Sequence, residues 1–185
     1  METEPGGAPD RTLICYRQAG VDPVGDPGLK TIRSRDAPVN RSEQMFLGAQ
    51  YSNMVAAPRA FVVTAADHWV YAGTGLHDGD QIANLVRGEA DRRFDGPVPD
   101  SLSYTILSTS PYITKYGAAD SAESVIYQAP SGGWVFDAGA FGWATGVGPG
   151  QLQDSRVQRM TSNILARMAD NLPDPMQARS WLTGN

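Results

Sequence analysis

The sequence predicts an α/β domain built on a layered mixed sheet. Short apolar runs typical of strands alternate with segments of helical spacing, and the last element has the form of an amphipathic helix. A Pro/Gly connection between two of the apolar runs indicates at least one antiparallel hairpin. With 185 residues and 41% hydrophobic content, the chain can bury the core of one domain.

The first half of the chain is expected to combine irregular and regular parts. Residues 1–11 are rich in Gly, Pro and acidic side chains, which is typical of a disordered lead-in, and the domain is expected to span 12–172. A strand is expected near 13–17. The stretch from Asp22 to Asn40 contains two Asp-Pro steps and two glycines, so it predicts a long loop and a candidate interaction surface.

The middle of the chain predicts a strand followed by a helix. The run at 61–63 is apolar and reads as a buried strand. After a polar turn, a helix is expected from about 80 to 92, because Ile82, Leu85 and Val86 recur at helical spacing.

The last third predicts three strands and a helix. The strands are expected at 102–107, 124–128 and 133–137, with the last two joined as a hairpin. The helix begins at Ser155, where a capping-box pattern precedes its apolar face. Five residues recur on that face: Val157, Met160, Ile164, Leu165 and Met168. Residues 173–185 are expected to be a C-terminal tail.

Composition and charge exclude several classes of partner. The net charge is −5 and the pI is about 4.9, and the longest run of basic residues is Arg92-Arg93, so nucleic acid and anionic membranes are not expected partners. No apolar run approaches the roughly 20 residues of a membrane-spanning helix. Because Cys15 is the only cysteine, no disulfide can form within the chain, and a cytoplasmic protein is expected.

The stretch from Asp67 to Asp80 is the strongest functional motif. It places two histidines, three aspartates and three glycines on an expected strand-to-helix turn. An ordinary tight turn has the same composition, since Gly permits positive φ and Asp caps helices. If the motif is functional, His68 is a candidate general base, and Asp80, Glu89 or Asp91 is its candidate carboxylate partner. His68, Asp80 and Glu89 also have side chains of the types that bind metals. These three residues are the predicted site, and the type of metal, if any, is left open.

The motif at 67–71 stands among several further segments with recognisable patterns: 38–43, 47–48, 73–76, 78–80, 85–86, Glu89 with Asp91, 132–139 and 157–163. Together these segments resemble the C-terminal region of the large (beta) subunit of N,N-dimethylformamidase. The resemblance extends from about residue 12 to 170, and the motif at 67–71 is its most specific part.

The resemblance implies a class I glutamine amidotransferase-like, flavodoxin-like fold, whole or in part. It also implies an enzyme or enzyme subunit that hydrolyses a small amide C–N bond. Dimethylformamidases use iron held by tyrosine and glutamate side chains, and the resemblance places those ligands upstream of the matched region, outside this chain. The cofactor of this chain is therefore not determined by the sequence.

Three interpretations of function remain open from the sequence. The chain is an amide hydrolase or its subunit acting on a small molecule, a noncatalytic module that completes a partner polypeptide, or a small standalone enzyme of secondary metabolism with changed chemistry. A second copy of the chain could also supply the missing half as a homo-oligomer.

Overall fold

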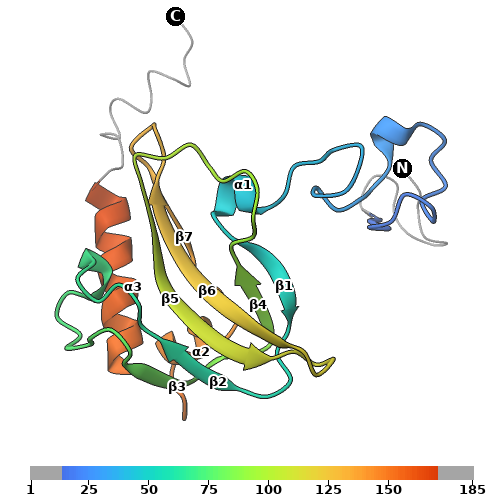
Figure 1. Ribbon diagram of the computed structural model, residues 1–185. Coiled ribbons are helices and arrows are strands. Elements are labelled where there is room, and N and C mark those ends of the chain that lie inside the picture. Colours follow the sequence, from blue (N-terminus) through green and yellow to red (C-terminus); the bar gives the residue numbers. More distant parts are fainter. Residues whose placement is uncertain (1–13, 171–185) are drawn as a thin grey trace, which may run out of the picture. The chain divides into compact units, whose positions relative to one another are not determined.

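The chain divides into two compact units, Met1–Glu43 and Gln44–Asn185. The computed structural model describes residues 14–170, so the expected lead-in at 1–11 and the tail at 173–185 lie outside the described residues. Within the described range, every β-strand and every α-helix belongs to the second unit (Figure 1). None of the helices in that range is long and apolar enough to cross a membrane.

The described part of the first unit is a loop with one 3-10 turn, η1 (Pro27–Leu29). The long loop expected from residue 22 to residue 40 is therefore confirmed. The strand expected near 13–17 is wrong, since residues 14–17 are irregular. The irregular backbone has a local cause, because Arg17 has a φ of 61°, which lies outside the strand region of backbone conformations.

Asp22 organises this loop. It is 4% exposed and is the one buried residue among residues 14–43. Its carboxylate accepts hydrogen bonds from the backbone amides of Val24 (2.9 Å) and Thr31 (2.6 Å) and from the Thr31 hydroxyl (2.7 Å). The described part of the first unit is thus held by polar contacts rather than by an apolar core.

The second unit is built mainly from antiparallel strands. In chain order, its elements within residues 44–170 are α1 (Gln44–Leu47), β1 (Gln50–Met54), β2 (Arg59–Val62), the 3-10 turn η2 (Trp69–Tyr71), β3 (Gln81–Val86), β4 (Glu89–Arg92), β5 (Ser103–Ile113), β6 (Ala119–Gln128), β7 (Trp134–Asp137), α2 (Trp143–Val147) and α3 (Ser155–Asp170).

The strand pairings form a closed cycle. β1 pairs with β4, β2 pairs with β3, and β5, β6 and β7 form a three-stranded sheet, with all pairings antiparallel. Isolated bridges join the β1–β2 run to β5 and join β4 to the segment after β7: Val55–Thr114, Val63–Ser108 and Ala90–Ala140. The three sheets are therefore linked to one another by single bridges.

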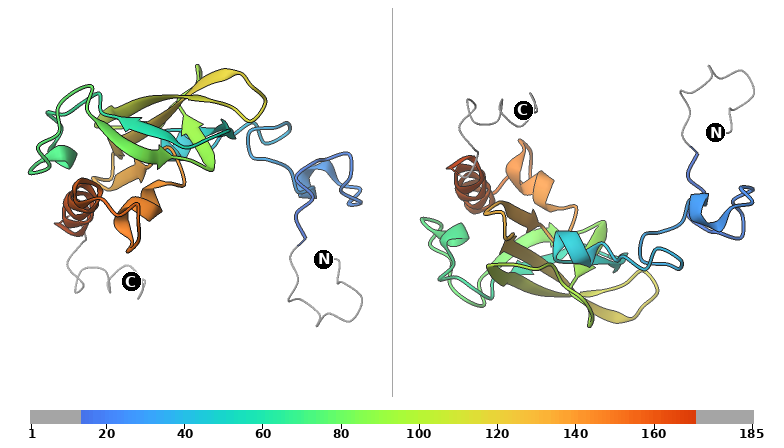
Figure 2. Two further views of the ribbon diagram at one scale, coloured as in Figure 1. Left: turned by 90° about the horizontal axis from the view of Figure 1, so that it is seen from below. Right: turned by 90° about the horizontal axis from the view of Figure 1, so that it is seen from above.

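The expected layered α/β fold of the class I glutamine amidotransferase-like, flavodoxin-like type is wrong. That fold requires parallel strands joined by crossover helices. Here the strands form small antiparallel sheets, and α3 is the one helix of the described residues longer than five residues. Both α2 and α3 lie on the same side of the strands rather than on opposite faces of a sheet (Figure 2).

The helix expected at 80–92 is also wrong, because this segment forms β3 and β4. Ile82 and Leu85 are both buried, and their spacing of three favours a helix when read from sequence. In the structure, Asn84 has a φ of 60°, which breaks the alternation of the strand and lets both side chains face inward. Gly88, with a φ of 74°, then separates the two strands.

The hairpin and the last helix are confirmed. β6 and β7 pair from Gln128–Trp134 to Val125–Asp137 across a short connection. α3 is present as expected, but its capping residue is Asp154 rather than Ser155, because Asp154 Oδ1 accepts from the Arg156 amide at 2.8 Å. Three of its five predicted core residues are buried: Val157, Met160 and Ile164. Leu165 differs from the prediction, since it is 60% exposed.

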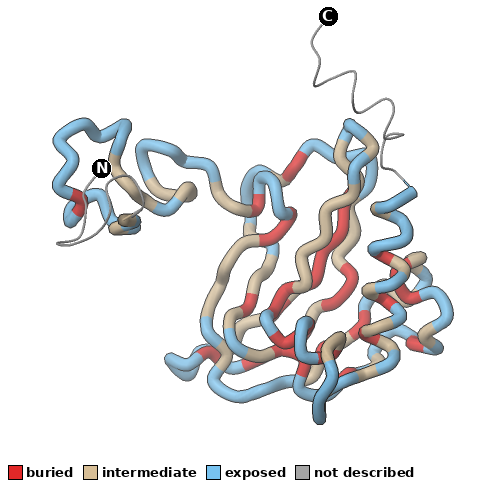
Figure 3. The backbone as a smooth tube through the Cα atoms, turned by 180° about the vertical axis from the view of Figure 1, so that it is seen from behind, coloured by how far each residue is buried: buried red, intermediate tan, exposed pale blue. Residues whose placement is uncertain are grey.

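One apolar core joins the strands to α2 and α3. Buried residues are concentrated in the strands and in the segments next to them (Figure 3). At its centre, the Trp143 ring meets the rings of Phe61 and Phe136 edge-on, with centroids 5.8 Å and 5.1 Å away. This core fixes the positions of the loop that connects β2 to β3 and of α3, which packs against that loop.

Candidate functional site

The polar motif lies in the loop between β2 and β3, and that loop is anchored on both sides. At its centre is η2, where the Tyr71 hydroxyl donates a hydrogen bond to the Leu107 carbonyl of β5 at 2.6 Å. From α3, Asn163 Nδ2 donates to two carbonyls of the loop, each at 2.9 Å. The motif is therefore held in one conformation by strand and helix together.

His68 stands immediately before η2 and caps it. Its Nδ1 accepts a hydrogen bond from the Val70 amide at 3.3 Å, which assigns the proton of the neutral ring to Nε2. Burial, and then the charge of Arg167, lowers the pKa of His68 below its usual value. His68 is therefore neutral at pH 7 and presents Nε2 as a donor. General-base catalysis at Nε2 would require the other tautomer and loss of the cap.

The aspartates of the motif bind backbone amides. Asp80 Oδ2 accepts from the His77 amide at 2.8 Å and lies 3.5 Å from His77 Nδ1. That backbone hydrogen bond is the main cause of the lowered pKa of Asp80. Asp78 Oδ1 accepts from the Ala66 amide at 2.7 Å. Both carboxylates thus close the turn on itself.

Glu89 lies at the start of β4, opposite Met54 of β1, rather than on a helix. His68 and Asp80 belong to one loop, whereas all of β3 separates Asp80 from Glu89. None of the hydrogen bonds and ion pairs described in residues 14–170 joins these three side chains to one another. Their joint catalytic role stays a prediction.

The described residues do not fit an iron site of the kind used by the resembled family, whose ligands the resemblance places outside this chain. A tyrosine ligand binds iron as phenolate, but four tyrosines donate their hydroxyls to oxygen acceptors: Tyr71 to Leu107, Tyr104 to Gly48, Tyr112 to Asp120 and Tyr127 to Phe46. Burial raises the pKa of Tyr104 and of Tyr112 to about 12, which disfavours the phenolate. Residues 14–170 also contain no group of three His, Cys, Asp or Glu that could hold a metal ion.

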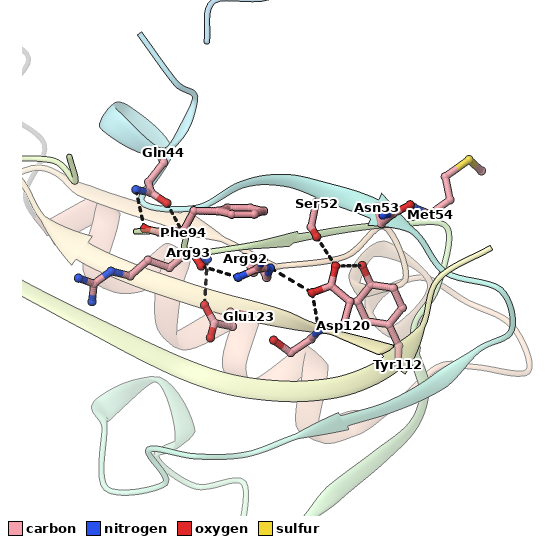
Figure 4. Close-up of polar contacts among 11 residues, drawn as sticks. Gln44, Ser52, Asn53, Met54, Arg92, Arg93, Phe94, Tyr112, Asp120 and Glu123 are labelled. Carbon is pink, nitrogen blue, oxygen red and sulfur yellow. Dashed lines mark hydrogen bonds and ion pairs between the residues drawn. The ribbon is translucent and has the colours of Figure 1, made fainter. Parts of the chain in front are cut away.

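A second polar site, not predicted from the sequence, lies where β1, β4, β5 and β6 meet (Figure 4). We call it the Asp120 cluster: Ser52, Arg92, Tyr112 and Asp120. The hydroxyls of Ser52 and Tyr112 both donate to Asp120 Oδ2, the latter at 3.1 Å. Arg92 Nε lies 3.0 Å from Oδ1, which also accepts from the Ser121 amide at 2.8 Å.

The electrostatics of the Asp120 cluster favour an ionised carboxylate and a neutral phenol. Burial alone would raise the pKa of Asp120, but the Ser52, Ser121 and Tyr112 hydrogen bonds and the Arg92 charge outweigh it and hold the pKa below its usual value. Burial is the main cause that raises the pKa of Tyr112. Arg92 Nε has no aligned hydrogen bond, so its attraction to Asp120 is that of an ion pair.

The contacts of the Asp120 cluster favour a role in holding strands together over a role in proton transfer. A carboxylate with a lowered pKa is a weak base, and the Ser52 hydroxyl faces a carboxylate rather than a histidine that could accept its proton. The Asp120 cluster instead connects four strands. Its members are separated by up to 68 residues in the sequence, so spacing carried no signal for it. Only the β5–β6 hairpin, which sets Tyr112 opposite Asp120, was open to prediction.

Comparison with known proteins identifies one family. The model of the family described as N,N-dimethylformamidase beta subunit-like, C-terminal matches residues 1–156. This range contains the seven strands found in residues 14–170 and ends just inside α3. No curated protein and no solved structure matches the chain.

Proposed function

Because the chain belongs to the N,N-dimethylformamidase beta subunit-like, C-terminal family, we propose that it is a domain of an enzyme that hydrolyses the C–N bond of a small, non-peptide amide. The family match over residues 1–156 is the observation that carries this proposal. In the reaction, water adds to the amide carbonyl carbon, the C–N bond breaks, and a carboxylic acid and an amine are released. The single cysteine, which can form no disulfide within the chain, supports a cytoplasmic setting.

The proposed contribution of the loop at 67–80 is to bind the amide oxygen. His68 is neutral, and its Nε2–H can donate to the negative charge that develops on that oxygen. Asp80 is proposed to keep the loop in position through the His77 amide. Glu89 is the proposed carboxylate that accepts a proton from water.

A partner is part of this proposal. Because β3 separates the loop that holds His68 and Asp80 from Glu89, the loop and Glu89 that act on one substrate are proposed to come from different polypeptides of an assembly. A partner polypeptide or a second copy of this chain would complete the site, as the term subunit in the family description suggests. We therefore expect hydrolysis in an assembled form of the protein.

The test is an assay for formate release from formamide and N,N-dimethylformamide over a range of protein concentrations, with size-exclusion chromatography on the same samples. We expect His68→Ala and Glu89→Gln to lower kcat/KM at least about 100-fold, the order of one general acid, base or oxyanion donor. His77→Ala, at the other histidine of the motif, is the matched control. Full activity in correctly folded His68 and Glu89 variants would remove the site assignment.

The second candidate function is a noncatalytic module that completes a partner chain. It is favoured by the polar atoms of the motif, because His68 Nδ1, Asp78 Oδ1 and Asp80 Oδ2 all accept backbone hydrogen bonds within the loop. In this case no formate is released at any concentration of the chain alone, and His68→Ala lowers its stability instead.

A further inference from the structure

The sequence contains two Asp-Gly steps, Asp78-Gly79 and Asp95-Gly96. An Asp-Gly step is chemically labile, because glycine has no side chain to shield its amide from the preceding carboxyl group. The structure holds the two steps very differently. This contrast allows each to serve as the reference for the other.

At Asp78-Gly79, both reacting groups are engaged. Asp78 Oδ1 accepts a hydrogen bond from the Ala66 amide at 2.7 Å. The Gly79 amide donates to the Val63 carbonyl at 2.9 Å. For the amide to attack the carboxyl carbon, both hydrogen bonds must break, so the reaction requires local opening of the loop.

At Asp95-Gly96, neither group is engaged. This step lies in the connection between β4 and β5, and both residues are exposed. Among the described contacts, none involves the Asp95 carboxylate or the Gly96 amide. The space beside the Gly96 α-carbon is open to 4 Å, and its φ of 133° is a conformation that favours glycine.

We propose that Asp95-Gly96 is a site of spontaneous conversion of aspartate to isoaspartate in the folded protein, whereas Asp78-Gly79 is protected. The Gly96 amide nitrogen loses its proton and bonds to Asp95 Cγ, and one water leaves with the carboxyl oxygen to form a cyclic succinimide. Water then adds back. Breaking the nitrogen bond to Cγ restores aspartate, and breaking the bond to the backbone carbonyl carbon gives isoaspartate with no net change in mass.

The conversion would act on a buried contact. Gln44 is 2% exposed and brackets the step: its Oε1 accepts from the Phe94 amide at 2.6 Å, and its Nε2 donates to the carbonyls of Phe94 (3.1 Å) and Pro97 (3.0 Å). Isoaspartate adds one methylene group to the main chain between these two carbonyls. Gln44 cannot then reach both in the same geometry, so α1 loses part of its attachment to the β4–β5 connection.

The experiment ages the full chain in neutral buffer, folded and in urea, and maps isoaspartate by peptide mass spectrometry with electron-transfer fragmentation. In the folded protein we expect at least about tenfold more isoaspartate at Asp95 than at Asp78, and similar amounts at both in urea. Equal conversion in the folded protein, or none at Asp95 while it converts in urea, would overturn the proposal.

A second measurement tests the role of Gln44. We expect the Tm of the wild-type chain to fall as Asp95 converts, and the Tm of Asp95→Glu, which forms no such five-membered ring, to stay constant over the same period. Asp100→Glu, at an exposed position of the same connection, is the matched control and should age like the wild type. An unchanged Tm in aged wild-type protein in which most of the Asp95 has become isoaspartate would overturn the proposed effect on Gln44.

Discussion

Asp120 is the shared partner of its cluster. The hydroxyls of Ser52 and Tyr112 and the guanidinium of Arg92 all contact its negatively charged carboxylate. Asp120→Asn removes the negative charge and can place an NH₂ group among hydrogen-bond donors. We expect the free energy of unfolding to fall by about 2 kcal/mol. A larger loss is not expected, since the Arg92 side chain is 33% exposed and water screens the pair.

Urea denaturation measures this loss. Asp100→Asn, which makes the same chemical change at an exposed position, is the matched control and should be nearly neutral. If the two variants lose the same stability, the Asp120 cluster does not stabilise the strands as the contacts indicate.

Because of His68, we expect the stability of the protein to depend on pH at values above those at which carboxylates titrate. Its pKa is lowered in the folded state, so the unfolded chain binds the proton more tightly. The contribution of neutral His68 to the free energy of unfolding is therefore fully present above the unfolded pKa of 6.5. It is lost as the pH falls from there towards the folded pKa. His68→Asn, which keeps a side-chain acceptor for the cap, should reduce this loss.

The measurement compares free energies of unfolding at about pH 7.5 and about pH 5.5, on either side of the usual histidine pKa. His77→Asn, at an exposed histidine, is the matched control and should retain the wild-type dependence. A wild-type loss that persists unchanged in His68→Asn would contradict the assigned cause.

Individual elements differed in how well their sequences predicted them. The β6–β7 hairpin and α3 were predictable because their signals are local: a Pro/Gly turn in one and an apolar face at helical spacing in the other. β3 was not, since one residue with positive φ, Asn84, gave a strand the burial spacing of a helix. The bridges that close the strand cycle join residues far apart in the chain, which no local pattern records.

The candidate sites also differ in this way: one has a local sequence signal, and the other depends on long-range pairing. The loop with His68 and Asp80 was located from its composition, because Gly and Asp concentrate in turns. The Asp120 cluster was missed because each of its members is unremarkable in its own segment. Only long-range pairing of β1, β4, β5 and β6 brings the four side chains together.

The attachment of the motif loop to α3 depends on Asn163. Asn163→Ala removes the two hydrogen bonds that its Nδ2 donates to carbonyls of the loop. We expect the free energy of unfolding to fall by about 1–2 kcal/mol, and the amides of η2 to exchange faster with deuterium. Ser162→Ala, at the exposed neighbouring position, should change neither quantity. Equal exchange at η2 in both variants would show that Tyr71 and His68 hold the loop without α3.

On the scale of the whole molecule, the two units are stabilised by different forces. The strands, α2 and α3 share one apolar core. Among residues 14–43 the one buried residue is the polar Asp22. Because burial of apolar surface is the main favourable term in folding, the first unit is expected to open at a much lower free-energy cost than the second.

Limited trypsin digestion of the full chain tests this difference. Arg41 and Arg59 are both exposed, but Arg41 lies in the loop of the first unit and Arg59 lies in β2, paired with Val86. A protease needs an extended, locally unfolded segment, so we expect cleavage after Arg41 to precede cleavage after Arg59 by at least about tenfold in rate. Intact-mass spectrometry of timed samples identifies the order. Simultaneous cleavage at both sites would mean that the first unit is as stable as the strand cycle, and that a surface outside its own loop supplies the apolar burial it lacks.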